Sequence, residues 1–209
     1  MWRRLVAVLL PGLIVAAVLP ADWIPLMNGK DLEGWEAVGD GVWSVMEGGI
    51  LVGDRTPGQS KHQAWLYTKR EFGEFDLRLE YWTRLGGNSG VSIRDKTRGF
   101  YAVEPNYDRE RTPSHNGYEI QITNGYKDSY PSGSIYLFAR AAEDRNKPGD
   151  WNLLEIESRN DMIRVRLNGK VVAEHPGDPK RPKMGPIGLQ LHDPNSVVLF
   201  RNIQIREVR

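Results

Sequence analysis

Apolar and polar side chains alternate in the stretch GYEIQI, residues 117–122. In an extended strand successive side chains point to opposite faces, so Ile120 and Ile122 would face a core while Glu119 and Gln121 point the other way. A carboxylate accepts hydrogen bonds, and an amide both donates and accepts them. Glu119 and Gln121 therefore either face solvent or bind a ligand rich in hydroxyl groups.

Two further segments repeat this alternation. In GVSIR the polar positions are Ser92 and Arg94, and in IGLQLHD they are Gln190 and His192. If these strands neighbour residues 118–123 in one sheet, their guanidinium, amide and imidazole groups share a surface that could bind a sugar ring in many directions. Each residue taken alone is more often a solvated strand position or a structural hydrogen-bond partner.

Two residues beside these strands could extend such a surface. Asn88 stands in the Gly-rich turn GGNSG ahead of Arg94, and glycine lets a backbone or a ligand approach closely. Tyr136, like Trp65 and Tyr101, could stack on the face of a sugar ring. The competing interpretation is that these aromatic residues belong to the core.

The elements that must position these residues are β-strands. Alternation is clearest in EFDLRLEYW, residues 74–82, and in MIRVRLNGKVVAEH, residues 162–175, where Asn168 and Gly169 predict a type I′ hairpin turn. Further strands are expected at 42–45, 50–52, 64–68, 90–94, 118–123, 134–138, 152–158, 187–192 and 197–206. No segment after residue 22 has a convincing helical period. We therefore expect an all-β protein, a jelly-roll β-sandwich of two antiparallel sheets.

The expected core consists of the apolar positions of these strands. It includes Leu77, Leu79, Ile120, Ile122, Val165, Leu189 and Leu191. The longest irregular stretch is 95–116, which is rich in charge and contains Pro105 and Pro113. A loop of this length is either functional or mobile, or a variable surface excursion.

Composition and charge exclude several classes of protein. The 209 residues carry a formal net charge of +1 with no clustering of Lys and Arg, so no nucleic-acid partner is expected. The chain contains no Cys, so it forms no disulfide and has no lipid-modified cysteine. Stability must come from the packed core.

The N-terminus has the layout of a secretory signal peptide. Arg3 and Arg4 precede an apolar run, residues 5–19, that stops at Pro20 and Ala21. We expect cleavage after Ala21, an exported protein in the periplasm or outside the cell, and one mature domain over 22–209 without stable membrane insertion. The alternative is an uncleaved anchor, although the run is shorter than the ~20 apolar residues that a spanning helix needs.

An ordered set of motifs carries a family resemblance. The set covers essentially the whole mature chain: LMNGKDLEGW (26–35), GEFDLRLEYW (73–82), GGNSGVSIR (86–94), GYEIQI (117–122), GSIY (133–136), PGDWNLLEI (148–156), IRVRLNGKVV (163–172), GPIGLQLHD (185–193) and FRNIQIRE (200–207). It resembles the 3-keto-disaccharide hydrolase family. The resemblance implies a concanavalin A-like jelly roll whose concave sheet carries the site, and activity on glycosides oxidised to a ketone at C3.

Such a substrate needs particular catalytic groups. The ketone acidifies the hydrogen on C2, so a base can remove it, form an enolate and expel the glycosidic oxygen from C1, after which water adds to the enone. This chemistry requires a base near C2, hydrogen-bond donors or positive charge at the enolate oxygen, and an acid for the leaving group. It requires no carboxylate nucleophile.

We assign these roles from chemistry and strand facing. His192 or Glu119 is the base, because imidazole has a suitable pKa near neutrality and Glu119 is the carboxylate of the central stretch; Asp193 is a helper or the acid. The expected substrate-binding residues are Arg94 and Gln121 at the carbonyl oxygen, with Gln190, Asn88 and Tyr136. No cofactor is expected. The alternative, a divalent ion held by Glu119, His192 and Asp193, lacks a dense spacing of ligands.

Two other functions remain open. A two-carboxylate glycoside hydrolase of the laminarinase-like type would place the motif E-x-D-x-E on one strand. The matching positions here are Glu119, Gln121 and Thr123, so only the first carboxylate is present. A partner for Glu119 would have to be Asp193 or Glu104. A non-catalytic carbohydrate-binding module would also present polar and aromatic residues on a sandwich face. Replacement of Glu119 and His192 would then change affinity alone.

Overall fold

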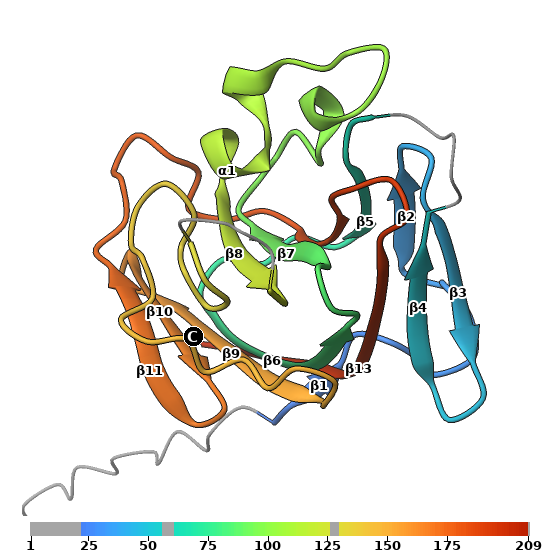
Figure 1. Cartoon of the computed structure of the whole chain (residues 1–209). Coiled ribbons are helices and arrows are strands. Elements are labelled where there is room, and N and C mark those ends of the chain that lie inside the picture. The colour runs from blue at the N-terminus through green and yellow to red at the C-terminus, as the bar shows by residue number, and fades with distance from the viewer. Residues whose placement is uncertain (1–21, 56–60, 126–129, 209) are drawn as a thin grey trace, which may run out of the picture.

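The computed structural model describes residues 22–55, 61–125 and 130–208, and the signal peptide expected at 1–21 lies outside them. Figure 1 shows two antiparallel sheets packed face to face, with one segment of short helices above the smaller sheet. The expected all-β jelly-roll sandwich is therefore confirmed. Within the described ranges, no helix is both long and apolar enough to cross a membrane.

The larger sheet has eight strands. Their order is β11 (Lys170–His175), β10 (Met162–Leu167), β9 (Asn152–Arg159), β6 (Phe75–Thr83), β13 (Val197–Glu207), β4 (Ile50–Asp54) and β3 (Val42–Met46), with the short β1 (Ile24–Pro25) also paired to β13. The smaller sheet has five strands, in the order β2 (Trp35–Val38), β5 (Ala64–Thr68), β12 (Ile187–Leu191), β7 (Asn88–Ile93) and β8 (Tyr118–Thr123).

The core lies between the sheets and is built by the predicted alternation. All seven residues expected in the core are 0–1% exposed. The hairpin turn between β10 and β11 is also as predicted, since Asn168 and Gly169 both have positive φ, 51° and 81°. These seven apolar side chains therefore belong to the main core, while the aromatic rings of Trp65 and Tyr67 on β5 belong to a second cluster.

One predicted strand is absent. Residues 134–138 form a tight turn in which only Ile135 makes isolated bridges, to Ile120 and Ala139. The backbone N–H groups of Phe138 and Ala139 both donate to the carbonyl of Ile135, and Leu137 has a φ of 70°. The chain thus folds back on itself where an extended segment was expected, beside the outer edge of β8.

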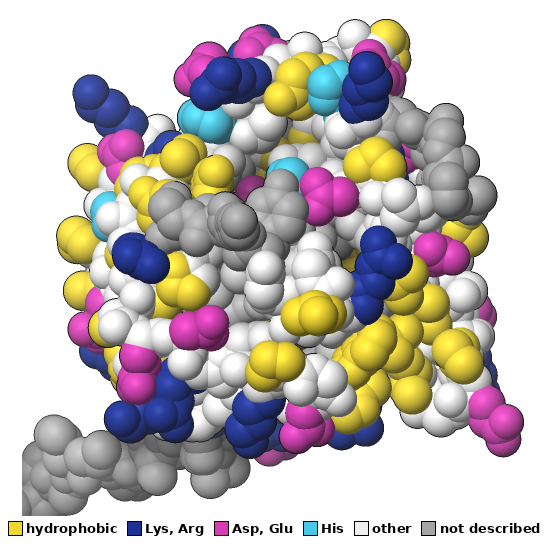
Figure 2. Space-filling model, in the orientation of Figure 1, with side chains coloured by type: hydrophobic (Ala, Val, Ile, Leu, Met, Phe, Trp, Pro, Cys, Tyr) yellow, Lys and Arg dark blue, Asp and Glu magenta, His cyan; other side chains and the backbone are white. Residues whose placement is uncertain are grey.

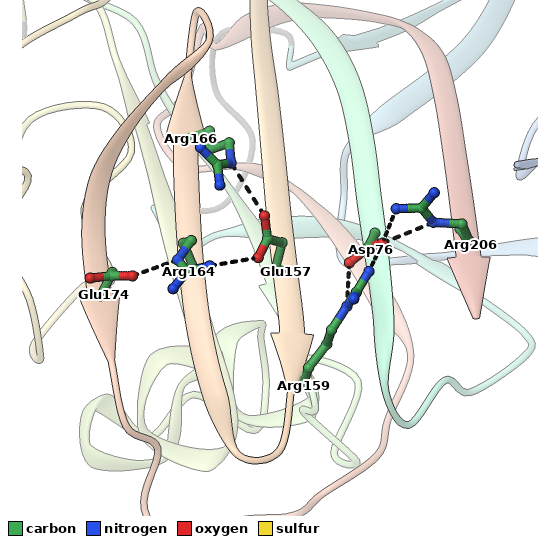
Figure 3. Close-up of polar contacts among 7 residues, drawn as sticks. All are labelled: Asp76, Glu157, Arg159, Arg164, Arg166, Glu174 and Arg206. Carbon is green, nitrogen blue, oxygen red and sulfur yellow. Dashed lines mark hydrogen bonds and ion pairs between the residues drawn. The ribbon is translucent and has the colours of Figure 1, made fainter. Parts of the chain in front are cut away.

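Charge pairs cover part of the outer face of the eight-stranded sheet (Figure 3). The buried carboxylate of Asp76 accepts hydrogen bonds from Arg159 and Arg206. On the neighbouring strands, Glu157 pairs with both Arg164 and Arg166. These alternating polar positions therefore satisfy one another across adjacent strands.

The outer face of the five-stranded sheet is covered differently. The segment 95–117, which contains η1 (Phe100–Ala102), η2 (Arg109–Arg111) and α1 (Pro113–Asn116), folds over this face. Ala102 and Val103 pack on Trp65 and Tyr67 of β5, forming an apolar cluster separate from the main core. Trp65 is thus buried under this segment, and the structure does not place its ring on an open binding surface.

The buried carboxylate of Asp95 holds this segment to the sheet. Its Oδ2 accepts hydrogen bonds from the Tyr67 hydroxyl (3.1 Å) and the Gly99 amide (2.8 Å). Its Oδ1 accepts from the amide and the hydroxyl of Thr97, at 2.9 and 2.6 Å. Burial, followed by the negative charge of Asp95, raises the pKa of Tyr67 well above its usual value, so the phenol keeps the proton that it donates.

We expect Asp95→Asn to destabilise the fold by about 3 kcal/mol, in the range for buried groups left without proper partners. The substitution keeps the shape, but one acceptor oxygen becomes an N–H donor that faces existing donors. Urea unfolding followed by tryptophan fluorescence measures the change.

The matched control is Asp54→Asn, on the exposed end of β4. A surface change of this kind should stay within about 0.5 kcal/mol of the unchanged chain. Equal midpoints for both variants would show that Asp95 does not anchor the segment.

Candidate functional site

A cavity of about 390 Å³ lies between the outer face of the five-stranded sheet and segment 95–117. Its lining contains Gln63, Asn88, Tyr107, Arg109, Glu110, Thr112, Ser114, His115, Glu119, Gln121, Tyr136, Leu137 and His192. Figure 2 shows acidic and His side chains in and beside a hollow below the helical segment. Of the eight predicted site residues, five line this cavity: Asn88, Glu119, Gln121, Tyr136 and His192.

Strand register brings the predicted polar positions together. β7 lies between β12 and β8, with Gly188 opposite Ser92 and Ser92 opposite Glu119. In the adjacent row, Gly90 lies opposite Gln121. The three strands are therefore sheet neighbours, as the interpretation of a shared polar surface required.

Glu119 is buried, with 4% of its surface exposed. Its Oε1 accepts a 2.9 Å hydrogen bond from Nε2 of Gln190. A Cβ atom at Gly90 would lie 2.9 Å from this same Oε1, so glycine is needed where the carboxylate crosses β7. Gln190 is fully buried and, within the described chain, does not line the cavity, so it contacts Glu119 from behind.

The amides of Asn88 and Gln121 form a second polar group in the cavity. Nε2 of Gln121 donates a 3.1 Å hydrogen bond to Oδ1 of Asn88. This contact fixes the Asn88 amide with its NH₂ as the remaining donor group. Tyr136 lies in the turn beside β8, where its backbone N–H donates to the carbonyl of Glu119.

His192 follows β12 and is held by the next residue. Its Nδ1 lies 2.8 Å from Oδ1 of Asp193. The amide of Asp193 in turn donates to the Ser196 hydroxyl, which closes the turn. If the carboxylate is ionised, it accepts from Nδ1–H and leaves the lone pair on Nε2, the tautomer of a general base. Asp193 itself is not among the described residues that line the cavity.

Arg94 is not brought to this cavity, contrary to the expected placement. Its φ of 60° interrupts the alternation of β7, so the side chain does not follow Ser92. The side chain is instead buried, with Nη1 3.7 Å from Oδ1 of Asp161 in the turn between β9 and β10. The expected contact between Arg94 and a substrate carbonyl has no geometric support.

The opposite wall of the cavity was not predicted residue by residue. It carries three groups in contact: Oγ1 of Thr112 lies 3.0 Å from Oγ of Ser114 and 2.9 Å from Nδ1 of His115. Burial lowers the pKa of His115 below its ordinary value; among nearby charges, Arg181 lowers it further while Glu110 opposes the shift. A lower pKa makes the protonated imidazole of His115 a stronger proton donor to a group in the cavity.

Arg181 fixes this wall from outside. Its guanidinium donates to the backbone carbonyls of Ser114, at 2.9 Å, and of Gly117. Ser114 lies within α1 and Gly117 directly follows it, so Arg181 ties this short helix to its position. The only sequence signal for this wall was the length of the irregular segment.

A metal ion would need several ligating side chains close together. Among the described residues, no group of three or more His, Asp or Glu is arranged to hold an ion. The carboxylate of Asp193 binds the imidazole of His192 rather than facing the cavity beside Glu119.

Comparisons with known proteins agree with the fold and the motifs. A 3-keto-disaccharide hydrolase of Bacteroides thetaiotaomicron is 27% identical over 160 residues, which cover 66% of this chain and 54% of that protein. The chain thus spans about half the length of this curated relative.

Solved structures give the same grouping. A candidate glycosyl hydrolase of Parabacteroides distasonis matches with a TM-score of 0.67 and 30% identity, over 90% of this chain and all of the other. A β-1,3-1,4-glucanase from a mouse hindgut metagenome matches with a TM-score of 0.57 and 14% identity, over 90% of this chain and 99% of that one, and shows the shared fold alone.

The family described as 3-keto-alpha-glucoside-1,2-lyase-like domain matches residues 22–206. This match covers both sheets and every residue that lines the cavity. The chain therefore belongs to the 3-keto-alpha-glucoside-1,2-lyase-like domain family.

Proposed function

We propose that this protein cleaves the glycosidic bond of glycosides oxidised to a ketone at C3. The observation that carries the proposal is the buried carboxylate of Glu119, which lines the same cavity as His192, whose imidazole contacts Asp193. Family membership and the name of the Bacteroides relative support the substrate class. No arrangement of paired carboxylates is needed for this reaction.

The reaction proceeds in two halves. A base removes the C2 proton, the electron pair moves through the enolate to form C1=C2, and the C1–O bond breaks as the leaving oxygen gains a proton. Water then adds to C1 of the enone, loses a proton to the acid–base group at C1, and C2 regains a proton. One group must therefore act at C2 and another near the oxygen on C1.

The sheet side of the cavity supplies the groups for C2 and the carbonyl. Glu119 or His192 removes the C2 proton, and Asp193 keeps the imidazole in the basic tautomer. The NH₂ group of Asn88, oriented by Gln121, donates to the enolate oxygen in place of Arg94.

The helical segment supplies a group for the leaving oxygen. His115 lies on the wall facing the sheet and exchanges protons through Nε2, while Thr112 and Ser114 hold its Nδ1 side. A hydroxyl can accept from Nδ1–H or donate to Nδ1, so the same contacts support His115 before and after proton transfer.

We expect the protein to release product from a 3-keto-glucoside and to leave the unoxidised parent glucoside unchanged, because only the ketone acidifies C2. Chromatography of both reactions, with deuterium incorporation at C2 in D₂O, checks this. Equal turnover of both substrates would instead favour a two-carboxylate hydrolase using Glu119 and Glu110, both of which line the cavity.

Substitution of the acid–base groups separates their roles. Glu119→Gln and His192→Asn should each lower turnover. The variant that lacks the true base should have turnover lower by roughly 10²–10⁴-fold, and its pH–rate profile should lack the limb due to that base. His115→Asn should lose less with an activated aryl leaving group than with a sugar, because a weakly basic oxygen needs little protonation. Steady-state kinetics on matched 3-keto substrates measures these effects.

His175→Asn is the control, because His175 lies on β11 and does not line the cavity. It should leave the pH–rate profile unchanged. Two results together would favour a carbohydrate-binding module. The wild-type protein would show no turnover, and the Glu119 and His192 variants would bind a 3-keto-glucoside more weakly than the wild type does.

We also propose that the protein is exported after cleavage behind Ala21. The basis is the Arg3–Arg4 pair and the apolar run that follows it. Mass spectrometry of protein from its native cell envelope should find a mature N-terminus at Asp22. An intact chain recovered only with membranes would show an uncleaved anchor.

A further inference from the structure

The side-chain amide of Gln190 has two arms, a donor arm (the Nε2 group) and an acceptor arm (Oε1), and among the described residues only the donor arm is paired. Its Nε2 donates to Glu119, as described above, while Oε1 is buried and has no hydrogen-bond partner within the described part of the chain. A buried carbonyl oxygen without a partner costs free energy, so an unpaired one beside a candidate site requires an explanation.

The surroundings of this oxygen limit what can pair with it. Gln190 is 0% exposed. A Cβ atom added at Gly90 would lie 3.2 Å from Oε1 of Gln190 and 2.9 Å from Oε1 of Glu119. The two oxygens therefore both lie over Gly90, on the same small area of β7. Because Gln190 is not among the described residues lining the cavity, a substrate hydroxyl is not the natural donor.

The carboxyl group of Glu119 can itself become that donor. When ionised it only accepts hydrogen bonds, and Nε2 of Gln190 is the matching donor; when protonated it carries an O–H that Oε1 of Gln190 can accept. The two arms of an amide lie in one plane, so a half-turn about its terminal torsion exchanges them.

We propose that Gln190 is a positioning residue that hydrogen-bonds Glu119 in both protonation states, through Nε2 to the carboxylate and through Oε1 to the carboxylic acid. The unpaired oxygen is then the acceptor held ready for the protonated state. A group that takes and returns a proton at C2 must keep its position in both states, and Gln190 provides this from behind the cavity.

Stability measurements test the hydrogen bonding without any substrate. Glu119→Gln places a permanent neutral amide, with one donor and one acceptor arm, where the protonated acid would be. We expect Gln190→Met to raise the unfolding equilibrium constant about five-fold or more in the wild type, the size of one net hydrogen bond. The same substitution in the Glu119→Gln background should cost at least as much, because a neutral amide at position 119 can pair with either the donor or the acceptor arm of Gln190.

The contrary result is equally clear. If Gln190→Met costs nothing in the Glu119→Gln background, Gln190 serves the carboxylate alone and the inference is wrong. Gln204→Met is the matched control, since Gln204 accepts from Arg78 on the other sheet. Its effect should be the same in both backgrounds.

The kinetic readout rests on the proposed function. Gln190→Met should lower kcat at least ten-fold while KM changes less than about three-fold, since the side chain does not touch substrate. Because Gln190 pairs with the carboxylate and with the carboxylic acid alike, the fall in kcat should be similar on both sides of the limb of the pH–rate profile due to Glu119. A fall in kcat confined to the pH range in which Glu119 is charged would contradict pairing in both states, whereas absence of turnover in the wild type would overturn only the proposed function.

Discussion

The candidate site depends on the hydrogen bonds that the carboxylate of Asp95 accepts. An outer sheet face is normally exposed to water, and a segment of more than twenty residues laid over it must be held against the conformational entropy that it loses. Asp95 turns the chain sharply at Thr97 and Gly99 and joins it to Tyr67 of β5. The apolar contacts of Ala102 and Val103 then cover one part of the face, and the cavity lies over another part.

The two outer faces of the sandwich carry similar polar residues, but these residues have different roles on the two faces. On the eight-stranded sheet, carboxylates and guanidinium groups pair with one another in the plane of the sheet, so their charges are neutralised by neighbours. On the five-stranded sheet, the carboxylate of Glu119 accepts a hydrogen bond from the amide of Gln190 and lines the cavity.

Alternation in the sequence predicted the strands and the buried side of each one, because a period of two is imposed by backbone geometry alone. It could not distinguish Glu119 and Gln121 from Asp76 and Arg78, since both pairs occupy the polar side of a regular strand. Only the covering segment makes one face a cavity, and that contact is non-local. Arg94 was misplaced because its left-handed φ is invisible to a periodic pattern. His115 was missed because an irregular segment has no period from which a facing could be predicted.

The turn at residues 133–139 has a consequence for association between chains. β8, which carries Glu119 and Gln121, is the last strand of its sheet, and an edge strand offers a row of open backbone groups to any extended peptide. The turn occupies that row: the amide of Gln121 donates to Ser134, its carbonyl accepts from Gly133, and the carbonyl of Glu119 accepts from Tyr136. Strand addition at this edge is thereby blocked, so the polar strand of the cavity gains protection against edge-to-edge aggregation without a charged gatekeeper.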